Sequence, residues 1–277
     1  MKSALVSVTI LASALPALAQ DAPGDWNLTI NRENRQTIAL TAYDNGIVLA
    51  ARCEKGVFQT LIGGLPEAPP ALNLLSSRRT LKIGFGDEPP RDHYFMLGAN
   101  RTVAFSELPS SLAREMRKGG RMTIVVEGAG EGGRNLRYVL DLPASNTAID
   151  QALADCRRPL ADPHDAQLSQ LTENGLPANI AWKRPPRGTY PAGRTYMSGF
   201  AVILCLSQPD GRLKDCMVET EMPVDGGFGD TALRATRNAV LENKDGGPVP
   251  ISRVTFRMNY QMEGTSDSPP TGTRLGS

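Results

Sequence analysis

Residues 199–218 read Gly-Phe-Ala-Val-Ile-Leu-Cys-Leu-Ser-Gln-Pro-Asp-Gly-Arg-Leu-Lys-Asp-Cys-Met-Val. Two strand-like runs flank Asp210-Gly211, a dipeptide that is typical of two-residue β-hairpin loops. With Asp210-Gly211 as the loop, Cys205 lies directly opposite Cys216. Facing positions on antiparallel strands bring Cβ atoms within disulfide reach, so we predict a hairpin closed by a Cys205–Cys216 disulfide.

The other two cysteines are Cys53 and Cys156. An even number of cysteines in an exported chain is typical of disulfides, and these two form the remaining pair. A helix expected over 146–156 turns Cys156 toward the core, because Ile149, Leu153 and Cys156 share one face by helical spacing. Buried thiols without a bridge, or a metal site, are the alternative, although no Cys-x-x-Cys spacing supports a metal.

The beginning of the chain resembles a bacterial signal peptide. Lys2 supplies a positive charge, residues 4–15 are apolar, and Ala17-Leu18-Ala19 has the small-residue pattern of a cleavage site. We predict a signal peptide over 1–19 and a periplasmic mature protein. A retained membrane anchor is the alternative, but the apolar run is shorter than the ~20 residues that cross a bilayer, and no later segment is apolar enough to do so.

Net charge and length limit the partners and the domain organisation of the remaining chain. The formal net charge of the 277 residues is +1, and removing Lys2 with the signal peptide brings it to zero, which argues against a nucleic-acid partner. The length predicts two domains. We expect a β-rich domain over 24–157, a Pro-rich interdomain linker over 158–189, a smaller domain over 190–262 and a disordered tail over 263–277.

The fold class predicted is α+β. In the first domain, strands are expected over 37–43, 47–53, 57–62, 79–85, 94–97, 102–105, 121–127 and 135–142. Two short helices, 109–118 and 146–156, interrupt these strands. The second domain is predicted to run strand, strand, helix, strand (β-β-α-β), with the helix over 230–243. Its last strand alternates apolar and polar residues from Val254 to Met262, which indicates one buried face and one solvated face.

Residues suited to catalysis are scarce. His93 and His164 lie in polar, Pro-flanked stretches, where a solvated surface position is the simplest interpretation. No Gly-x-Ser-x-Gly nucleophile motif is present, and pairing the cysteines leaves no thiol nucleophile. We therefore predict a protein that is not an enzyme, with no catalytic residues, no metal site and no cofactor.

Two sets of residues are candidates for binding. The last strand is an edge that can accept an extended peptide by strand addition, through Arg257, Met258, Asn259, Tyr260 and Gln261. The alternative is that this edge is covered within the fold. Aromatic stacking on a ligand is the second possibility, through Trp182, Tyr190 and Tyr196; for Trp182, docking on a domain is the simpler interpretation.

The region 190–262 resembles the C-terminal domain of TonB-type energy transducers. The resemblance is carried by Tyr190-Pro191, Pro209-Asp210-Gly211, Cys216-x-Val218, an Ala-rich helix and Pro248-Val249-Pro250 before the alternating strand. It implies a periplasmic domain that grips outer-membrane receptors by strand addition. The chain differs in having a cleavable signal peptide and a globular first domain in place of a membrane anchor and spacer, so we expect docking rather than energy transduction.

The first domain is more weakly similar to invasion-associated locus B proteins and to accessory proteins of type VI secretion. The shared features are Trp26, Cys53 and a terminal Leu140-x-Leu142…Ala148…Leu153…Cys156 segment. Both groups are non-enzymatic envelope proteins. The sequence therefore predicts a periplasmic protein–protein interaction module, accessory to TonB-dependent transport, whose partner is a TonB-dependent receptor or a TonB-system component. The alternative is a non-enzymatic binding module for cell-wall glycan or a small ligand.

Overall fold

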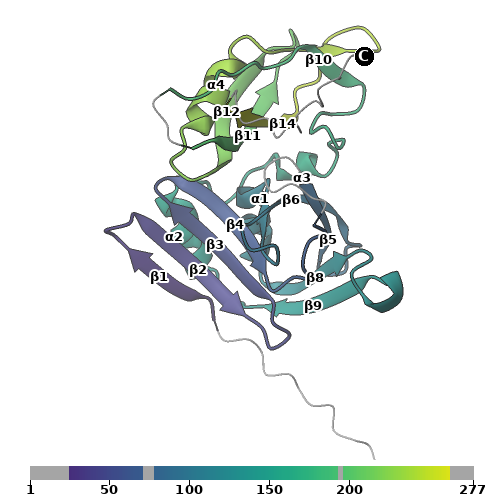
Figure 1. Ribbon diagram of the computed structural model, residues 1–277. Helices are drawn as coiled ribbons and strands as arrows, with labels where there is room; N and C mark the ends of the chain where they lie inside the picture. Colours follow the sequence, from purple (N-terminus) through teal and green to yellow (C-terminus); the bar gives the residue numbers. More distant parts are fainter. Residues whose placement is uncertain (1–24, 71–77, 193–195, 263–277) are drawn as a thin grey trace, which may run out of the picture.

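The computed structural model describes residues 25–70, 78–192 and 196–262, and the expected signal peptide and tail lie outside them. The described chain is β-rich with few helices and forms two stacked units (Figure 1). We call residues 25–156 the first unit, residues 157–175 the connecting segment and residues 176–262 the second unit. No helix among the described residues is long and apolar enough to cross a membrane.

The first unit is a nine-stranded antiparallel sheet with two helices. Its elements are β1 (Asn27–Asn31), β2 (Gln36–Ala42), β3 (Val48–Glu54), β4 (Val57–Gly63), β5 (Arg78–Phe85), β6 (Arg91–Leu97), β7 (Ala104–Ser106), α1 (Pro109–Met116), β8 (Gly120–Val126), a 3₁₀ turn (Glu131–Gly133), β9 (Leu136–Leu142) and α2 (Thr147–Asp155). The strand order is β1-β2-β3-β4-β7-β6-β5-β8-β9. Eight of these strands lie where the sequence predicts them.

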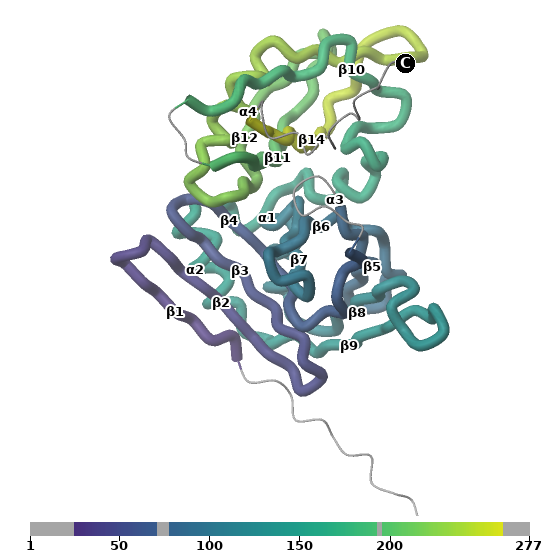
Figure 2. The backbone as a smooth tube through the Cα atoms, viewed as in Figure 1, coloured from purple at the N-terminus to yellow at the C-terminus, as the bar shows by residue number. Residues whose placement is uncertain are grey.

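The sheet curls around one core (Figure 2). The two ends of the strand order come close together, since the hydroxyl of Tyr43, directly after β2, donates to the Asp141 carbonyl of the last strand, β9. Helix α2 packs on β2 and β3, and α1 packs on β4. Trp26, Phe58 and Phe95 lie in this core. The fold therefore depends on alternating strand residues that bury one face.

Strand β1 was not predicted from the sequence. Only Leu28 and Ile30 in it are apolar, and four of its five residues are exposed. It forms a strand because it pairs with β2 in register from Asn27 opposite Leu40 to Asn31 opposite Gln36. Pairing with a neighbour, which no local pattern records, decides this element.

The second unit is built on a three-stranded antiparallel sheet, β12-β11-β14. The remaining elements are α3 (Asp165–Leu168) in the connecting segment, then β10 (Ile180–Arg184), β11 (Ser198–Ser207), β12 (Leu213–Met222), α4 (Phe228–Thr236), β13 (Val240–Asn243) and β14 (Arg253–Gln261). Helix α4 packs across β11 and β12. Strands β11 and β12, helix α4 and strand β14 follow the expected order, but β10 precedes them and β13 lies between α4 and β14.

Two sequence predictions in this unit need correction. The proposed linker over 158–189 contributes β10, which pairs with β13, and Leu176 and Ile180 lie in the second core. The helix expected over 230–243 ends at Thr236, because Leu241 leaves it to pair with Trp182 of β10. Both errors have one cause: β10 and β13 stabilise each other, and each is weak as an isolated pattern.

The β11–β12 hairpin differs from the expected one by a single residue. Its loop has three residues, since Gln208 N donates to Arg212 O (2.9 Å) and Gly211 has φ +80°. A bulge in β12 then brings Cys216 back opposite Cys205, as predicted. Leu206 pairs with Lys214 and Leu204 pairs with Met217, so Cys205 faces both Asp215 and Cys216. The Cys205–Cys216 disulfide forms at this bulge.

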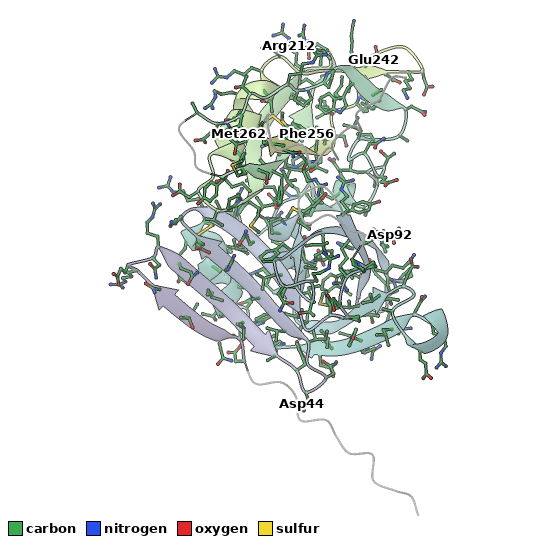
Figure 3. All side chains as sticks on the ribbon, viewed as in Figure 1. Asp44, Asp92, Arg212, Glu242, Phe256 and Met262 are labelled. Atoms are coloured by element: carbon green, nitrogen blue, oxygen red, sulfur yellow. A yellow bond between two sulfur atoms is a disulfide. The ribbon has the colours of Figure 1, made fainter. Side chains whose placement is uncertain are left out.

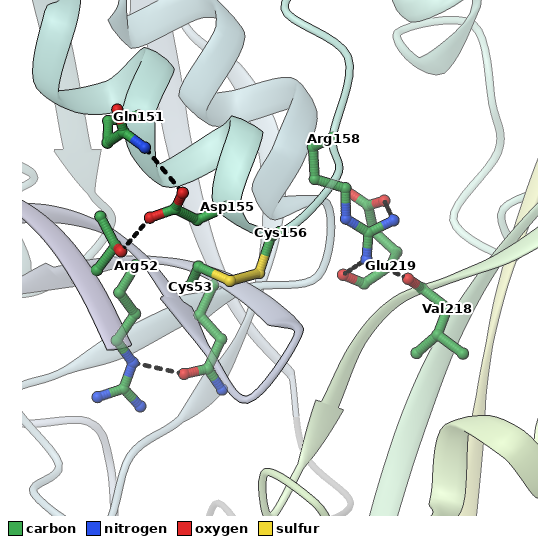
Figure 4. The surroundings of a disulfide bond; sticks show 10 residues. Arg52, Cys53, Gln151, Asp155, Cys156, Arg158, Val218 and Glu219 are labelled. Atoms are coloured by element: carbon green, nitrogen blue, oxygen red, sulfur yellow. Dashed lines mark hydrogen bonds and ion pairs between the residues drawn. A yellow bond between two sulfur atoms is a disulfide. The ribbon is translucent and has the colours of Figure 1, made fainter. Parts of the chain in front are cut away.

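The second disulfide joins Cys53 at the end of β3 to Cys156 at the end of α2, the other pair expected from the sequence. Figure 4 shows it beside Asp155, which accepts hydrogen bonds from Thr37 and Gln151. All four cysteines are therefore bridged. Two disulfides are typical of secreted, extracytoplasmic proteins.

Candidate functional site

The two units meet through a small apolar contact. Phe200 and Val202 of β11 pack against Met96 of β6, and Phe105 and Met222 lie beside them. Strand β11 is therefore buried on both faces, with one face in the second core and the other at the first unit. The expected solvated face of this sheet is solvated only in part, because the first unit covers it.

Buried charges surround that contact. The Glu107 carboxylate, which follows β7, accepts hydrogen bonds from Arg78 of β5 (3.0 Å) and from Arg257 of β14 (3.1 Å). The side chains of Glu107 and Arg257 are 8% and 7% exposed. Arg257 also lies over the Phe200 ring, 5.9 Å from its centroid. Because a buried carboxylate needs compensating donors, this cluster ties β14 to the first unit.

Glu219 of β12 makes a second link, at the start of α1. Its Oε1 accepts a hydrogen bond from the Ser110 backbone N–H (2.8 Å), at a helix end whose own N-cap residue supplies no side-chain bond. The strand pairs Val202 with Thr220 but Ile203 with Val218, so Glu219 is the extra residue of a bulge. The bulge directs this buried carboxylate out of the second unit and onto the N-terminus of α1.

The connecting segment is fastened to both units. Arg158 donates to the carbonyls of Val218 and Glu219 (Figure 4). Asp165 accepts two hydrogen bonds from Arg114 of α1, at 2.5 and 2.7 Å. Asp162 accepts one from Arg253 of β14 at 2.5 Å. Side chains from three parts of the chain thus hold the units in one arrangement.

Asp162 also lies 3.0 Å from the Nδ1 atom of His164. Burial by itself raises the pKa of the Asp162 carboxyl, but hydrogen bonds from His164 and Arg253 outweigh burial and lower that pKa below its usual value. The Asp162 carboxylate is therefore stabilised in its charged form.

A groove of about 1100 Å³ lies between the first unit and the connecting segment. Residues of β5, β6 and α1 form one wall, and residues 160–173 form much of the other. Tyr94 and Arg78 lie on the first wall, with the guanidinium carbon 5.0 Å from the ring centroid. Glu173 is on the opposite wall. The groove is therefore lined by an aromatic ring with a guanidinium over it and by further charged groups.

His93 also lines the groove, and its side chain is half-buried, less solvated than the sequence suggested. Burial, assisted by the positive charge of Arg91, lowers the pKa of His93 to about 4. The imidazole is therefore neutral at pH 7, with one nitrogen able to donate a hydrogen bond and the other to accept one.

The candidate edge strand β14 is partly covered. It ends the three-stranded sheet, but the Thr255 N–H donates to the Gly175 carbonyl at 2.8 Å. Gly175 has φ +72°, and a Cβ there would overlap the Thr255 carbonyl, so only glycine allows this approach. Outward N–H groups alternate along an antiparallel strand, which places that of Asn259 on the same side as that of Thr255.

The five residues proposed for partner binding fall into a buried group and an exposed group. Arg257 belongs to the interface between the units. Tyr260 is 6% exposed and packs on Phe228, and burial raises the pKa of its hydroxyl to about 12. Met258 lies against the same core, whereas Asn259 and Gln261 are exposed. An incoming chain would therefore meet two amide side chains.

The three aromatic residues proposed for stacking do not gather around the groove. Trp182 packs edge-to-face on Phe256, with ring centroids 5.3 Å apart, in the second core. Tyr190 packs in the same way on Phe228 and donates from its hydroxyl to the Tyr196 carbonyl. For Trp182, the simpler sequence interpretation of docking on a domain matches its position.

Sequence reasoning assigned His93 to a solvated surface and did not single out Glu107 or Glu219. The only available signal for Glu219 was a run of alternating glutamates in Val-Glu-Thr-Glu, which is common on solvated strands. Burial of Glu107 and Glu219 depends on contacts between the two units, so no local spacing reveals it. The described residues contain no cluster of His, Cys, Asp and Glu side chains suited to a metal ion.

Comparison of the chain with protein-family models, with curated proteins and with solved structures gave no significant match.

Proposed function

We propose that this chain is a non-enzymatic, extracytoplasmic binding module that docks an extended segment of another envelope protein along β14. The observation that carries the proposal is the outer edge of β14, where the Thr255 N–H already donates a hydrogen bond outward, to the Gly175 carbonyl. A partner segment continues that pairing toward Asn259 by strand addition. The bridged hairpin and the charged interface hold β14 rigidly, which lowers the entropy lost on binding.

The resemblance of 190–262 to TonB-type domains suggests the partner. On that basis the segment belongs to a TonB-dependent receptor or to a TonB-system component, and the chain is an accessory of transport across the outer membrane. The periplasm and the cleaved signal peptide are part of the same proposal, which the two disulfides support.

The test is crosslinking in intact cells with a photo-reactive residue at Asn259. The matched control places the same residue at Glu242, an exposed position on β13 that lies at the end of the second unit away from the first unit (Figure 3). We expect adducts with an outer-membrane receptor or a TonB-system component from position 259 alone. No adduct at 259, or equal adducts at both positions, would overturn docking at β14.

A second variant separates strand addition from side-chain contact. Asn259→Pro removes the outward N–H donor of an edge strand, a position where proline is tolerated, and Asn259→Ala leaves that donor in place. We expect the proline variant to abolish the adduct from a probe at Gln261 and the alanine variant to retain it. Equal loss in both variants, with unchanged thermal unfolding, would contradict pairing through the backbone.

The groove favours a second candidate function, the binding of a cell-wall glycan or another small polar ligand. Its volume of about 1100 Å³ lies at the upper end of ligand sites, and its lining includes the Tyr94 ring and the neutral, hydrogen-bonding ring of His93. This function predicts retention on purified peptidoglycan that Tyr94→Ala abolishes and Tyr196→Ala does not. Unchanged retention of the Tyr94 variant would exclude the groove.

A further inference from the structure

The start of α1, the bulge of β12 and the connecting segment enclose a small polar site. Ser110 lies in the first turn of α1, Glu219 is the bulged residue of β12, and Arg158 belongs to the connecting segment. Ser110 is 2% exposed, and the side chains of Arg158 and Glu219 are 8% and 2% exposed. The site is therefore closed to bulk solvent and separate from the groove, which other residues line.

Two polar atoms in this site have no hydrogen-bond partner. Across residues 25–70, 78–192 and 196–262, three buried side-chain nitrogen or oxygen atoms are without one, and two of these are Ser110 Oγ and Arg158 Nε. Buried polar atoms are nearly always paired, because an unpaired one loses its bonds to water without compensation. Two such atoms beside one carboxylate therefore indicate a further hydrogen-bonding group between them.

The Glu219 carboxylate connects the two unpaired atoms. Its Oε1 accepts a hydrogen bond from the Ser110 backbone N–H at 2.8 Å. Its Oε2 lies 4.0 Å from Arg158 Nη1, and this separation is too long for a hydrogen bond. Two hydrogen bonds of about 2.8 Å that share one water oxygen can join atoms this far apart.

Other contacts keep Arg158 from closing that separation. Its Nη2 donates to the carbonyls of Val218 and Glu219, as Figure 4 shows. Moving the guanidinium toward Oε2 would lengthen both bonds to the backbone of β12. The arrangement therefore favours a bridge between Arg158 and Glu219 over direct contact.

The charges of the site select a neutral ligand. The Glu219 carboxylate repels an anion, and the Arg158 guanidinium repels a cation. The ligand also has to accept a hydrogen bond from the Nε–H group, donate one to Oε2 and fit inside a closed site. Water meets these conditions, since it donates two hydrogen bonds and accepts two, and buried waters typically make about three.

From these observations we propose that Ser110, Arg158 and Glu219 bind one water molecule at the boundary between the units. The water accepts a hydrogen bond from Arg158 Nε–H, donates one to Glu219 Oε2 and makes a third with the Ser110 hydroxyl. Both unpaired atoms then have a partner. The three residues come from the first unit, the connecting segment and the second unit, so this water joins all three parts of the chain.

Diffraction from crystals of the folded chain, at a resolution that shows ordered waters, tests the site directly. We expect one water oxygen within about 3.2 Å of Ser110 Oγ, Arg158 Nε and Glu219 Oε2. Electron density without a water there, with the Ser110 hydroxyl and Arg158 bonded directly to Glu219 or to other groups, would overturn the proposal.

Oxygen-17 magnetic relaxation dispersion tests the same site in solution, because it counts waters that stay bound for longer than surface waters do. In Ser110→Val, methyl groups replace the hydroxyl and fill the site, so the dispersion amplitude should fall by the contribution of one water. The matched control is Ser111→Val, at a half-buried position that lines the groove, and it should leave this contribution in place.

Circular dichroism establishes first that both variants fold. Equal amplitudes in Ser110→Val and in the unchanged chain, or equal losses in the two variants, would contradict a water bound at Ser110. The diffraction experiment requires no substitution, so it decides the question if Ser110→Val does not fold.

Discussion

Each unit of the molecule contains one disulfide, and the two disulfides join cysteines at very different separations in the sequence. In the first unit, Cys53–Cys156 joins positions 103 residues apart and fixes α2 to β3. In the second, Cys205–Cys216 joins positions 11 residues apart within one hairpin. The first bridge decides which parts of the chain lie together, whereas the second only secures a pairing that the local sequence already favours. The first unit should therefore depend more strongly on its bridge.

The Cys53–Cys156 disulfide also lies next to residues that join the two units. Two residues after Cys156, Arg158 donates to the backbone of β12 (Figure 4). On β12, Glu219 reaches back to α1 of the first unit. The end of α2 is thus anchored both to the core of the first unit and to the interface between the units. Removing the Cys53–Cys156 disulfide should therefore destabilise the core and the interface together.

The largest expected effect is the loss of the long disulfide. In the chain-entropy model, removing a bridge across 103 residues costs about 5 kcal/mol of unfolding free energy, and removing one across 11 residues costs about 3 kcal/mol. Urea unfolding of Cys53→Ala/Cys156→Ala and of Cys205→Ala/Cys216→Ala measures both. Equal losses in the two variants would mean that the comparison between the units is wrong.

Replacing Glu219 should have the next largest effect. In Glu219→Ala, the Ser110 N–H loses its buried acceptor, and Arg158 loses a nearby negative charge. We expect a loss of about 3 kcal/mol and, in calorimetry, a split into two transitions as the units uncouple. Glu242→Ala, at an exposed position of the same unit, is the control and should change stability by less than about 0.5 kcal/mol. A single transition in Glu219→Ala would show that other contacts suffice for coupling.

The smallest effect is a dependence on pH at His93. Burial lowers the pKa of folded His93 from 6.5 to about 4, so between these values the unfolded chain binds a proton that the folded chain does not. The free energy of unfolding should therefore fall by about 1–3 kcal/mol as the pH decreases from 7 to 4. His93→Gln, neutral throughout, should lack this part of the decrease. Parallel pH profiles for the two proteins would place His93 in solvent.

Much of the first unit was predictable from its sequence. Most strand positions and both helices follow from patterns that span a few residues. The pairing of the cysteines also followed, because hairpin opposition and one helical face left a single combination. The loop between β11 and β12 was predicted one residue too short, and the bulge at Asp215 compensated for that error.

Composition, turn residues and apolar alternation were enough to indicate an extracytoplasmic, β-rich protein with two bridges, since each depends on near neighbours in the chain. Three features became visible only in the folded molecule. They are strand β10, the hydrogen bond from the Ser110 N–H to Glu219, and the burial of His93. Each joins residues far apart in sequence and exists only when β13, α1 or the connecting segment is in place. Contacts of that kind leave no periodic pattern, because their free energy arises from packing between elements rather than within them.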